Sequence, residues 1–276
     1  AVRIIVSCAD DPAAEQEGPE HQVLSALESR DPLPLDILLG DLGEDEVRTI
    51  ITEYLREYCK ELDPKCVETI CAMPQARNPL YLLVMLGELR TLGGNEMNKI
   101  VPRLITSMAH DHPDPVSLFR WVLERMEVFG AGALRWWCLY LAAGRVGMAS
   151  HELADLLAKK LGASAAATAL LVERGLRRYL QRRGGQLDFF HGQLRQAVVV
   201  RYGSKADIVQ SHREIAAHFR SLADPADNHS WKSNCLRAFS ELAFHLTMAE
   251  ELDLLCNTLS DLCSVSYTHL TLPTKR

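Results

Sequence analysis

The chain has 276 residues, of which 47% are hydrophobic and 7% aromatic, and its formal net charge is −6 at pH 7. This composition is typical of a helix-rich globular protein, and the acidic balance argues against nucleic acid as a partner. No run approaches the roughly 18 apolar residues that suggest a membrane span, so we expect no membrane partner. Eight scattered cysteines without a CxxC pair predict reduced thiols in the cytoplasm, not a disulfide framework or a zinc site.

Residues 1–40 predict the remnant of an α/β domain. Val2–Ser7 is an apolar run typical of a buried strand, and such a strand needs neighbours with which to pair. Because no other strand precedes it, the sequence reads as a piece of a longer protein. Asp10–Asp31 is polar and acidic, contains prolines, and predicts a loop with one weak helix.

Residues 41–110 predict a helical bundle. GEDEVRTIITEYLREYCKEL has apolar residues at helical spacing and acids in its first turn, where the helix dipole favours them. Further helices are expected to begin at Asp63-Pro64 and at Asn78-Pro79, because proline at the first helical position has no N–H to leave unpaired. The second of these ends near Gly93-Gly94, and Met97–Met108 continues the helical pattern.

Residues 111–203 predict a winged-helix domain. Asp114-Pro115 begins a helix, and the apolar GALRWWCLYLAAG predicts a buried one. Ser150 is expected to cap HELADLLAKKL, and the next helix is expected to end at Gly175. Two short strand-like runs then flank Gly184-Gly185, whose positive φ angles suit a tight hairpin. Helix, helix, hairpin and a further helix over 193–201 are the order of a winged helix.

Residues 204–263 predict three helical segments, the onset of a helical repeat array. Val265–Thr274 resembles a translated sequencing adaptor. We therefore expect residues 264–276 to be an artefactual tail and exclude them from fold considerations.

The order and separation of several segments resemble the C-terminal half of a STAND-class P-loop NTPase module, of the NACHT and apoptosome type. The likeness is strongest to the subgroup of the telomerase-associated vault protein and the nephrocystins. It spans about Val2–Leu262 and is carried by IIVSCAD, LGEDEVRTIITEYL, RNPLYLLVMLGELRTLGG, FFHGQLRQAVVVRY and ELAFHL. The resemblance implies a mainly α fold: a truncated α/β NTPase strand, a helical lid bundle, a winged helix with a small β-hairpin, and the start of an α-helical solenoid.

The resemblance also implies a nucleotide site. Ser7 matches the sensor position at the strand end, although Ala9 stands where an arginine is frequent in the family. Asn78 and Pro79 match the lid motif whose proline packs near the adenine. His191 matches the histidine that donates to the β-phosphate of ADP, with Gly192 in place of the aspartate of the MHD motif. Each residue also has a purely structural reading, as a strand end, a helix start or an element junction.

The chain contains neither a GxxxxGK[ST] loop nor an acidic strand end for Mg²⁺, so we expect no catalytic residue and no hydrolysis by this chain alone. In the intact protein, the resemblance implies an ATP/ADP-dependent signalling switch that uses Mg²⁺ and the missing N-terminal nucleotide-binding half. It also implies a homo-oligomer in the ATP state and protein partners bound through downstream WD40 or TPR-like repeats.

Two other functions remain open. One is a helical scaffold or adaptor with no nucleotide role. The other is a winged-helix DNA-binding regulator, but its recognition helix would be the alanine-rich ASAAATALLVER, which has few groups able to read base edges. The basic wing could contact phosphates, dock an acidic domain or be a solvated face; its arginines are Arg177, Arg178, Arg182 and Arg183. HDHPD, residues 110–114, is not expected to bind a metal, since adjacent loop residues rarely share one tetrahedral ion.

Overall fold

The computed structural model describes residues 25–27, 29, 40–92, 94–231, 233 and 235–261. The strand predicted at Val2–Ser7 and the tail predicted at 264–276 lie outside these ranges. The chain divides into two compact units, residues 1–41 and 42–276. The predicted domain limits inside the second unit stay predictions.

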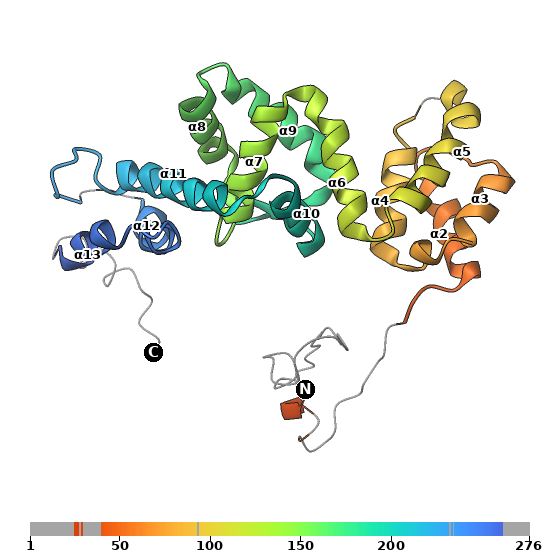
Figure 1. Cartoon of the computed structure of the whole chain (residues 1–276), viewed down its shortest axis with the longest axis horizontal. Helices are drawn as coiled ribbons and strands as arrows, with labels where there is room; N and C mark the ends of the chain where they lie inside the picture. The colour runs from red at the N-terminus through yellow and green to blue at the C-terminus, as the bar shows by residue number, and fades with distance from the viewer. Residues whose placement is uncertain are drawn as a thin grey trace. The chain divides into compact units, whose positions relative to one another are not determined.

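The first three α-helices of this unit begin where the sequence predicts (Figure 1). The third ends at Leu89, earlier than the predicted Gly93-Gly94, and the fourth begins at Gly94, earlier than the predicted Met97. The carboxylate of Asp63 accepts from the backbone N–H of Lys65 at 2.9 Å, and Asn78 caps the next α-helix in the same way. Both caps are followed by proline at the first helical position, so no backbone donor there lacks a partner. The elements are α2 (Glu44–Arg56), α3 (Pro64–Cys71), η1 (Pro74–Arg77), α4 (Pro79–Leu89) and α5 (Gly94–Asp111).

The next elements follow the helix–strand–helix–helix–hairpin order of a winged helix. They are α6 (Pro115–Met126), η2 (Glu127–Phe129), α7 (Ala131–Ala143), β1 (Met148–Ala149), α8 (Ser150–Leu161), α9 (Ala165–Leu176), η3 (Arg177–Tyr179), β2 (Leu180–Arg183), β3 (Gln186–Phe189) and α10 (Gly192–Tyr202). The hairpin turns at Gly184 and Gly185, with φ of 56° and 87°. The small sheet is antiparallel in the order β1-β3-β2, with Met148 opposite Leu187 and Leu180 opposite Phe189.

Three details differ from the sequence prediction. The strand β1 was not predicted, because two residues carry no recognisable alternation. Ser150 does not cap α8: the first turn is closed by Glu152, whose carboxylate accepts from the N–H of Ala149 at 2.8 Å. Gly175 lies inside α9, and a β-carbon there would lie 2.5 Å from the terminal methyl of Met126. Close packing between helices, not helix termination, therefore explains this glycine.

Three helices complete the described chain: α11 (Lys205–Ala223), α12 (Leu236–Met248) and α13 (Leu252–Ser260). α12 packs against both α11 and α13, and more extensively against α11. The loop between α11 and α12 is organised by Asp224, whose carboxylate accepts from the N–H of His229 at 2.8 Å, and by the buried ring of Trp231.

One continuous hydrophobic core connects α2 to α12. Its largest fully buried side chains include Trp137 and Tyr140 of α7, the helix predicted to be buried. The predicted fold class, mainly α with a small β-hairpin, is confirmed. No helix in the described ranges has the length and apolar character required to cross a bilayer.

Candidate functional site

The predicted lid residues lie at the N-terminus of α4. Asn78 Oδ1 accepts from the backbone N–H groups of Leu80 and Tyr81 at 3.0 and 3.1 Å. This oxygen is therefore occupied by helix capping. Pro79 is exposed at the first position of the helix. Ser7, the predicted sensor, lies outside the described residues.

His191 lies where β3 gives way to α10, at the N-cap position of that helix. Its ring packs edge-on against Phe190, with centroids 4.5 Å apart. Partial burial lowers the pKa of His191 below its ordinary value, so the imidazole is neutral at pH 7 and has one N–H to donate. Within the described part of the chain, no hydrogen bond or ion pair involves this side chain, and no contact of these kinds joins it to Asn78 or Pro79.

A first cluster of buried polar side chains joins the helical bundle to the winged helix. Glu88 of α4 is 9% exposed at its side chain and receives three groups. Arg125 Nη1 of α6 lies 2.8 Å from its carboxylate, Tyr179 donates its hydroxyl at 2.9 Å, and Arg178 Nη1 lies at 3.5 Å. We call Glu88, Arg125, Arg178 and Tyr179 the Glu88 cluster.

The approach of η3 to α4 is unusually close in this cluster. Arg178 also donates to the carbonyl of Gly87, and a β-carbon at residue 87 would lie 3.1 Å from the Arg178 Nη1. Burial, followed by the nearby Glu88 carboxylate, raises the pKa of Tyr179 well above its ordinary value. The phenol is therefore protonated at pH 7 and donates its proton to Glu88. All three partners of the buried carboxylate belong to elements other than α4.

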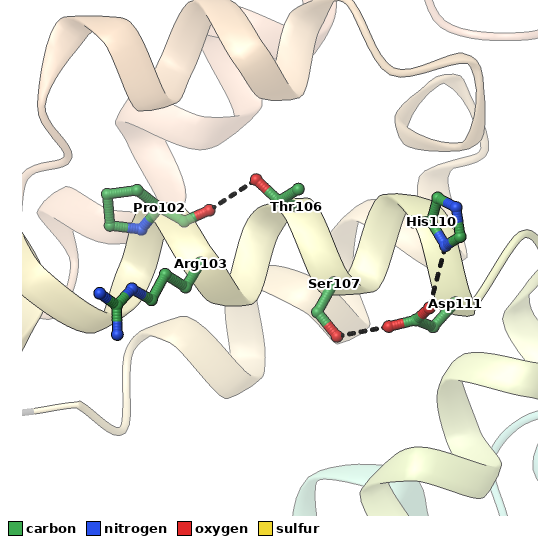
Figure 2. A pocket seen from close by; sticks show the side chains of 6 residues that line it. All are labelled: Pro102, Arg103, Thr106, Ser107, His110 and Asp111. Atoms are coloured by element: carbon green, nitrogen blue, oxygen red, sulfur yellow. Dashed lines mark hydrogen bonds and ion pairs between the residues drawn. The ribbon is translucent and has the colours of Figure 1, made fainter.

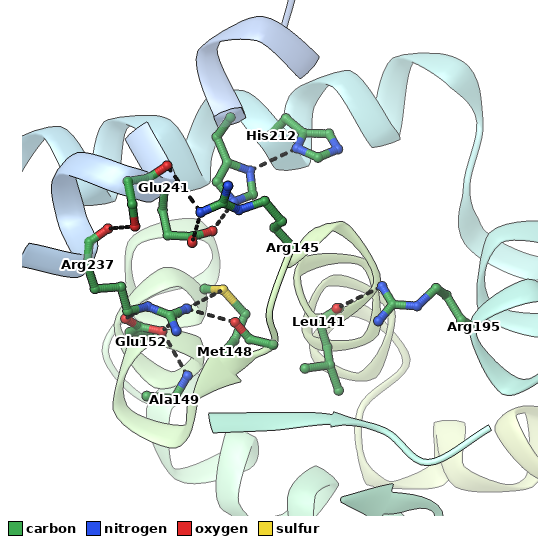
Figure 3. A network of polar contacts seen from close by, with 12 residues as sticks. Leu141, Arg145, Met148, Ala149, Glu152, Arg195, His212, Arg237 and Glu241 are labelled. Atoms are coloured by element: carbon green, nitrogen blue, oxygen red, sulfur yellow. Dashed lines mark hydrogen bonds and ion pairs between the residues drawn. The ribbon is translucent and has the colours of Figure 1, made fainter. Parts of the chain in front are cut away.

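A second cluster joins the winged helix to α12. Arg145, in the turn after α7, lies 2.9 Å from Glu241, whose side chain is 1% exposed. Arg237 pairs with Glu152 of α8 at 3.2 Å and donates to the carbonyl of Gly147 at 2.7 Å (Figure 3). Arg145 pairs with a carboxylate of α12, and Arg237 of α12 pairs with a carboxylate of α8. Each of the four charges therefore has a partner of opposite sign on another element. These four residues, Arg145, Glu152, Arg237 and Glu241, form the Glu241 cluster.

Buried histidines extend this cluster into α11. His212 Nδ1 lies 2.8 Å from His245 Nδ1, so one imidazole donates to the other, and His245 Nε2 lies 3.7 Å from Glu241. Burial and the neighbouring His245 lower the pKa of His212 to about 4. Burial also lowers the pKa of His218 to about 4, and both of its ring nitrogens are buried without a hydrogen-bond partner among the described residues.

Glu214 of α11 provides a third connection. It accepts from the Tyr140 hydroxyl of α7 at 2.5 Å and from Lys160 of α8 at 2.6 Å. The Lys160 ammonium also lies 3.9 Å from the ring centre of Trp136. The helices after the winged helix are therefore attached to it by polar side chains as well as by the apolar core.

Two cavities of the described chain are lined by residues other than Asn78, Pro79 and His191. A 520 Å³ depression lies along one face of α5, and its polar side chains bond mainly within that helix (Figure 2). Ser107, for example, donates to Asp111 at 2.8 Å. A second cavity, between α7, α10 and α11, has a volume of only 70 Å³ and is mostly apolar. The described residues contain no group of three metal ligands, and Asp114 caps α6 as predicted.

The sequence prediction did not identify the Glu88 and Glu241 clusters as junctions. Their signal was present as isolated acids inside apolar helical runs, such as Glu88 in LYLLVMLGELR and Glu241 in AFSELAFHL. Acids are rarely fully buried without a partner. The partners come from distant segments, however, so the sequence pattern could identify the acids but not the arginines.

The sequence matches no family model and no solved structure. It is 24% identical over 225 residues to a TPR repeat-containing protein of Dictyostelium discoideum. This alignment covers 79% of the present chain and 13% of the Dictyostelium protein, so the chain spans only a small part of that relative's length.

Proposed function

We propose that this chain is a helical scaffold, which holds a winged helix in one orientation between a helical bundle and the first helices of a repeat array. The observation that carries the proposal is the pair of buried charged clusters on the two sides of the winged helix. Glu88 and Glu241 are both nearly inaccessible to water, and their partners lie on other elements.

Buried ion pairs contribute little net stability, because desolvation opposes the Coulombic attraction. Their separation is costly, however, since it leaves a buried carboxylate without a partner. The cost is about 3–5 kcal/mol for a fully buried pair, and it is lower here because Arg125 and Arg145 are 39% and 42% exposed. A rotation of the winged helix about either cluster would separate an ion pair and incur this cost. Apolar side chains, in contrast, could slide past one another without leaving a charge unpaired. The similarity to a TPR repeat-containing protein supports a role in which helices present surfaces to other proteins.

Distance measurements between spin labels test the scaffold. Cys59 after α2 and Cys256 on α13 are both exposed and accept labels directly, once Cys8, Cys235 and Cys263 are replaced by serine. A scaffold gives one narrow distance distribution that millimolar Mg-ADP or Mg-ATP leaves unchanged. A broad or multi-peaked distribution in the unperturbed protein, or a shift with nucleotide, would contradict the proposal.

A nucleotide-dependent switch of the STAND type is the second candidate function. The observation that favours it is the His191 imidazole, neutral and without a hydrogen-bond partner in the described chain, at a junction between elements. In this hypothesis, His191 donates to the β-phosphate of ADP held by an upstream domain, Pro79 lies near the adenine, and Mg²⁺ accompanies ATP. Oligomerisation in the ATP state and presentation of downstream repeats follow from the release of that contact.

The switch is tested in a protein that includes the upstream sequence. His191→Ala should accelerate the release of a fluorescent ADP about tenfold, the effect of losing about 1.4 kcal/mol of hydrogen bonding, and should raise the oligomeric fraction. His151→Ala is the matched control, since His151 is an exposed histidine of the neighbouring helix α8. Equal ADP release rates in the two variants would count against this function.

A further inference from the structure

The helix α9 is apolar on two sides, although the fold uses only one of them. Ala165, Ala169, Val172 and Leu176 are buried in the core. On the opposite side, Leu170 and Leu171 are 54% and 50% exposed. Together with the exposed Ala167 and Arg174, they occupy positions i, i+3, i+4 and i+7, which is the spacing of a helix face that contacts another helix.

The wing adds positive charge beside these leucines. Arg182 of β2 pairs with Glu173 of α9 at 2.7 Å, so the hairpin and the helix lie next to each other. Arg174 of α9 and Arg177 of η3 are also exposed, whereas Arg183 follows Arg182 in the strand and so lies on the opposite face of the hairpin. The acids of these elements are already paired, Glu173 with Arg182 and Asp188 with Arg195. We call Ala167, Leu170, Leu171, Arg174, Arg177 and Arg182 the α9–wing surface.

The surface therefore combines an apolar centre with a basic border, in a chain whose net charge is −6. Single exposed leucines are ordinary, but contiguous apolar groups with a polar rim mark interaction sites. Charged side chains at the rim select the partner by their complementarity. A complementary partner needs apolar side chains at helical spacing and carboxylates on either side of them.

We propose that the α9–wing surface docks an acidic amphipathic helix of another protein. The partner's apolar face covers Leu170 and Leu171, and its carboxylates pair with Arg174 and Arg177. This proposal rests on the scaffold proposal and deepens it. It names the class of partner to which the scaffold presents its winged helix. Duplex DNA fits less well, because alanine and leucine offer no hydrogen bonds to base edges and would be placed against polar groove atoms.

A phage-displayed library of helical peptides with randomised surface positions, panned against the 276-residue protein, tests the proposal without presuming the charge of the partner. The expected peptides carry apolar residues at i, i+3, i+4 and i+7 and an excess of Asp and Glu. By fluorescence anisotropy, Leu170→Ser/Leu171→Ser should weaken their binding at least tenfold. Arg174→Glu/Arg177→Glu should weaken it similarly and reduce its dependence on salt.

Leu236→Ser is the matched control, since Leu236 is 53% exposed on α12, away from this surface. It should leave the affinity unchanged. Failure to enrich any peptide, enrichment of basic peptides, or binding that survives the double leucine change would overturn the proposal. So would a mixed-sequence DNA duplex that binds at physiological salt and depends on the arginines but not on the leucines. The spin-label distances report on the scaffold separately, so a failure of the docking proposal can be distinguished from a failure of the scaffold.

Discussion

Replacing Glu88 by glutamine should destabilise the protein, although the two side chains have nearly the same volume. The glutamine can still accept the Tyr179 hydroxyl, which lies 2.9 Å from the carboxylate. It cannot neutralise Arg125 and Arg178, which lie 2.8 and 3.5 Å away. The effect therefore isolates the buried charge from packing.

The magnitude follows from these two contacts. A hydrogen bond to a charged group contributes about 1.5–3 kcal/mol and a neutral one about 0.5–1.5 kcal/mol, so each arginine loses about 1 kcal/mol. Both arginines keep some contact with water, being 39% and 25% exposed, and this places the total below the 3–5 kcal/mol of a fully buried pair. We expect Glu88→Gln to lower the free energy of unfolding by about 2 kcal/mol.

Urea unfolding followed by circular dichroism measures this difference. Glu124→Gln is the control: it makes the same chemical change at a carboxylate that is 64% exposed and 3.6 Å from Arg201, and it should cost at most about 0.5 kcal/mol. If both variants unfold at the same urea concentration, the Glu88 cluster does not fix the orientation of the winged helix, and the reasoning behind the scaffold is refuted.

The remaining predictions use the same unfolding assay. As the pH falls from about 6.5 to about 4, the unfolded chain binds a proton that the buried His212 does not, so the contribution of His212 to stability, fully present above that window, falls by about 3 kcal/mol. His212→Leu should therefore reduce the pH dependence, and the part due to His218, whose pKa is also lowered to about 4, should remain. Gly147→Ala should cost about 2–4 kcal/mol, because φ is +87° and the new methyl would lie 2.2 Å from the Leu187 carbonyl oxygen. Gly175→Ala should stay within about 1 kcal/mol, because the flexible end of Met126 can move. Asn78→Ala removes a helix cap and should cost about 1 kcal/mol.

Each of these has a clear contrary result. A stability profile of unchanged steepness in His212→Leu would mean that other groups dominate acid unfolding. Equal costs for the two glycine substitutions would mean that the backbone at Gly147 adapts. An unaltered stability in Asn78→Ala would mean that capping by this side chain contributes little to folding, and it would favour another role for Asn78.

Most of the fold could be predicted from local sequence signals. Asp63 and Asn78 cap helices that the Pro at the following position begins, and the paired glycines at 184–185 turn the hairpin. These signals act over three or four residues and depend little on the rest of the molecule. Gly175 was misinterpreted for the opposite reason, since the space it leaves is filled by Met126, almost fifty positions earlier in the sequence.

The candidate site was less accessible to prediction. The resemblance selected Ser7, Asn78, Pro79 and His191. Ser7 lies outside the described residues, the structure shows a capping role for Asn78, and the nucleotide roles of all four stay predictions. The buried polar clusters depend on pairs such as Glu88 with Arg178 and Arg145 with Glu241, about ninety residues apart. No periodicity links such positions, because they meet only when the helices pack.

The order β1-β3-β2 leaves β2 at an edge of the small sheet. An open strand edge is a template on which a second molecule can pair its own backbone, the usual first step of sheet-mediated aggregation. Here that strand is only four residues long and ends in Arg182 and Arg183, both exposed. Charged side chains on a strand edge oppose such pairing, so neutralising Arg183, which leaves the Arg182–Glu173 ion pair in place, should show first as turbidity at high protein concentration, not as lost folding.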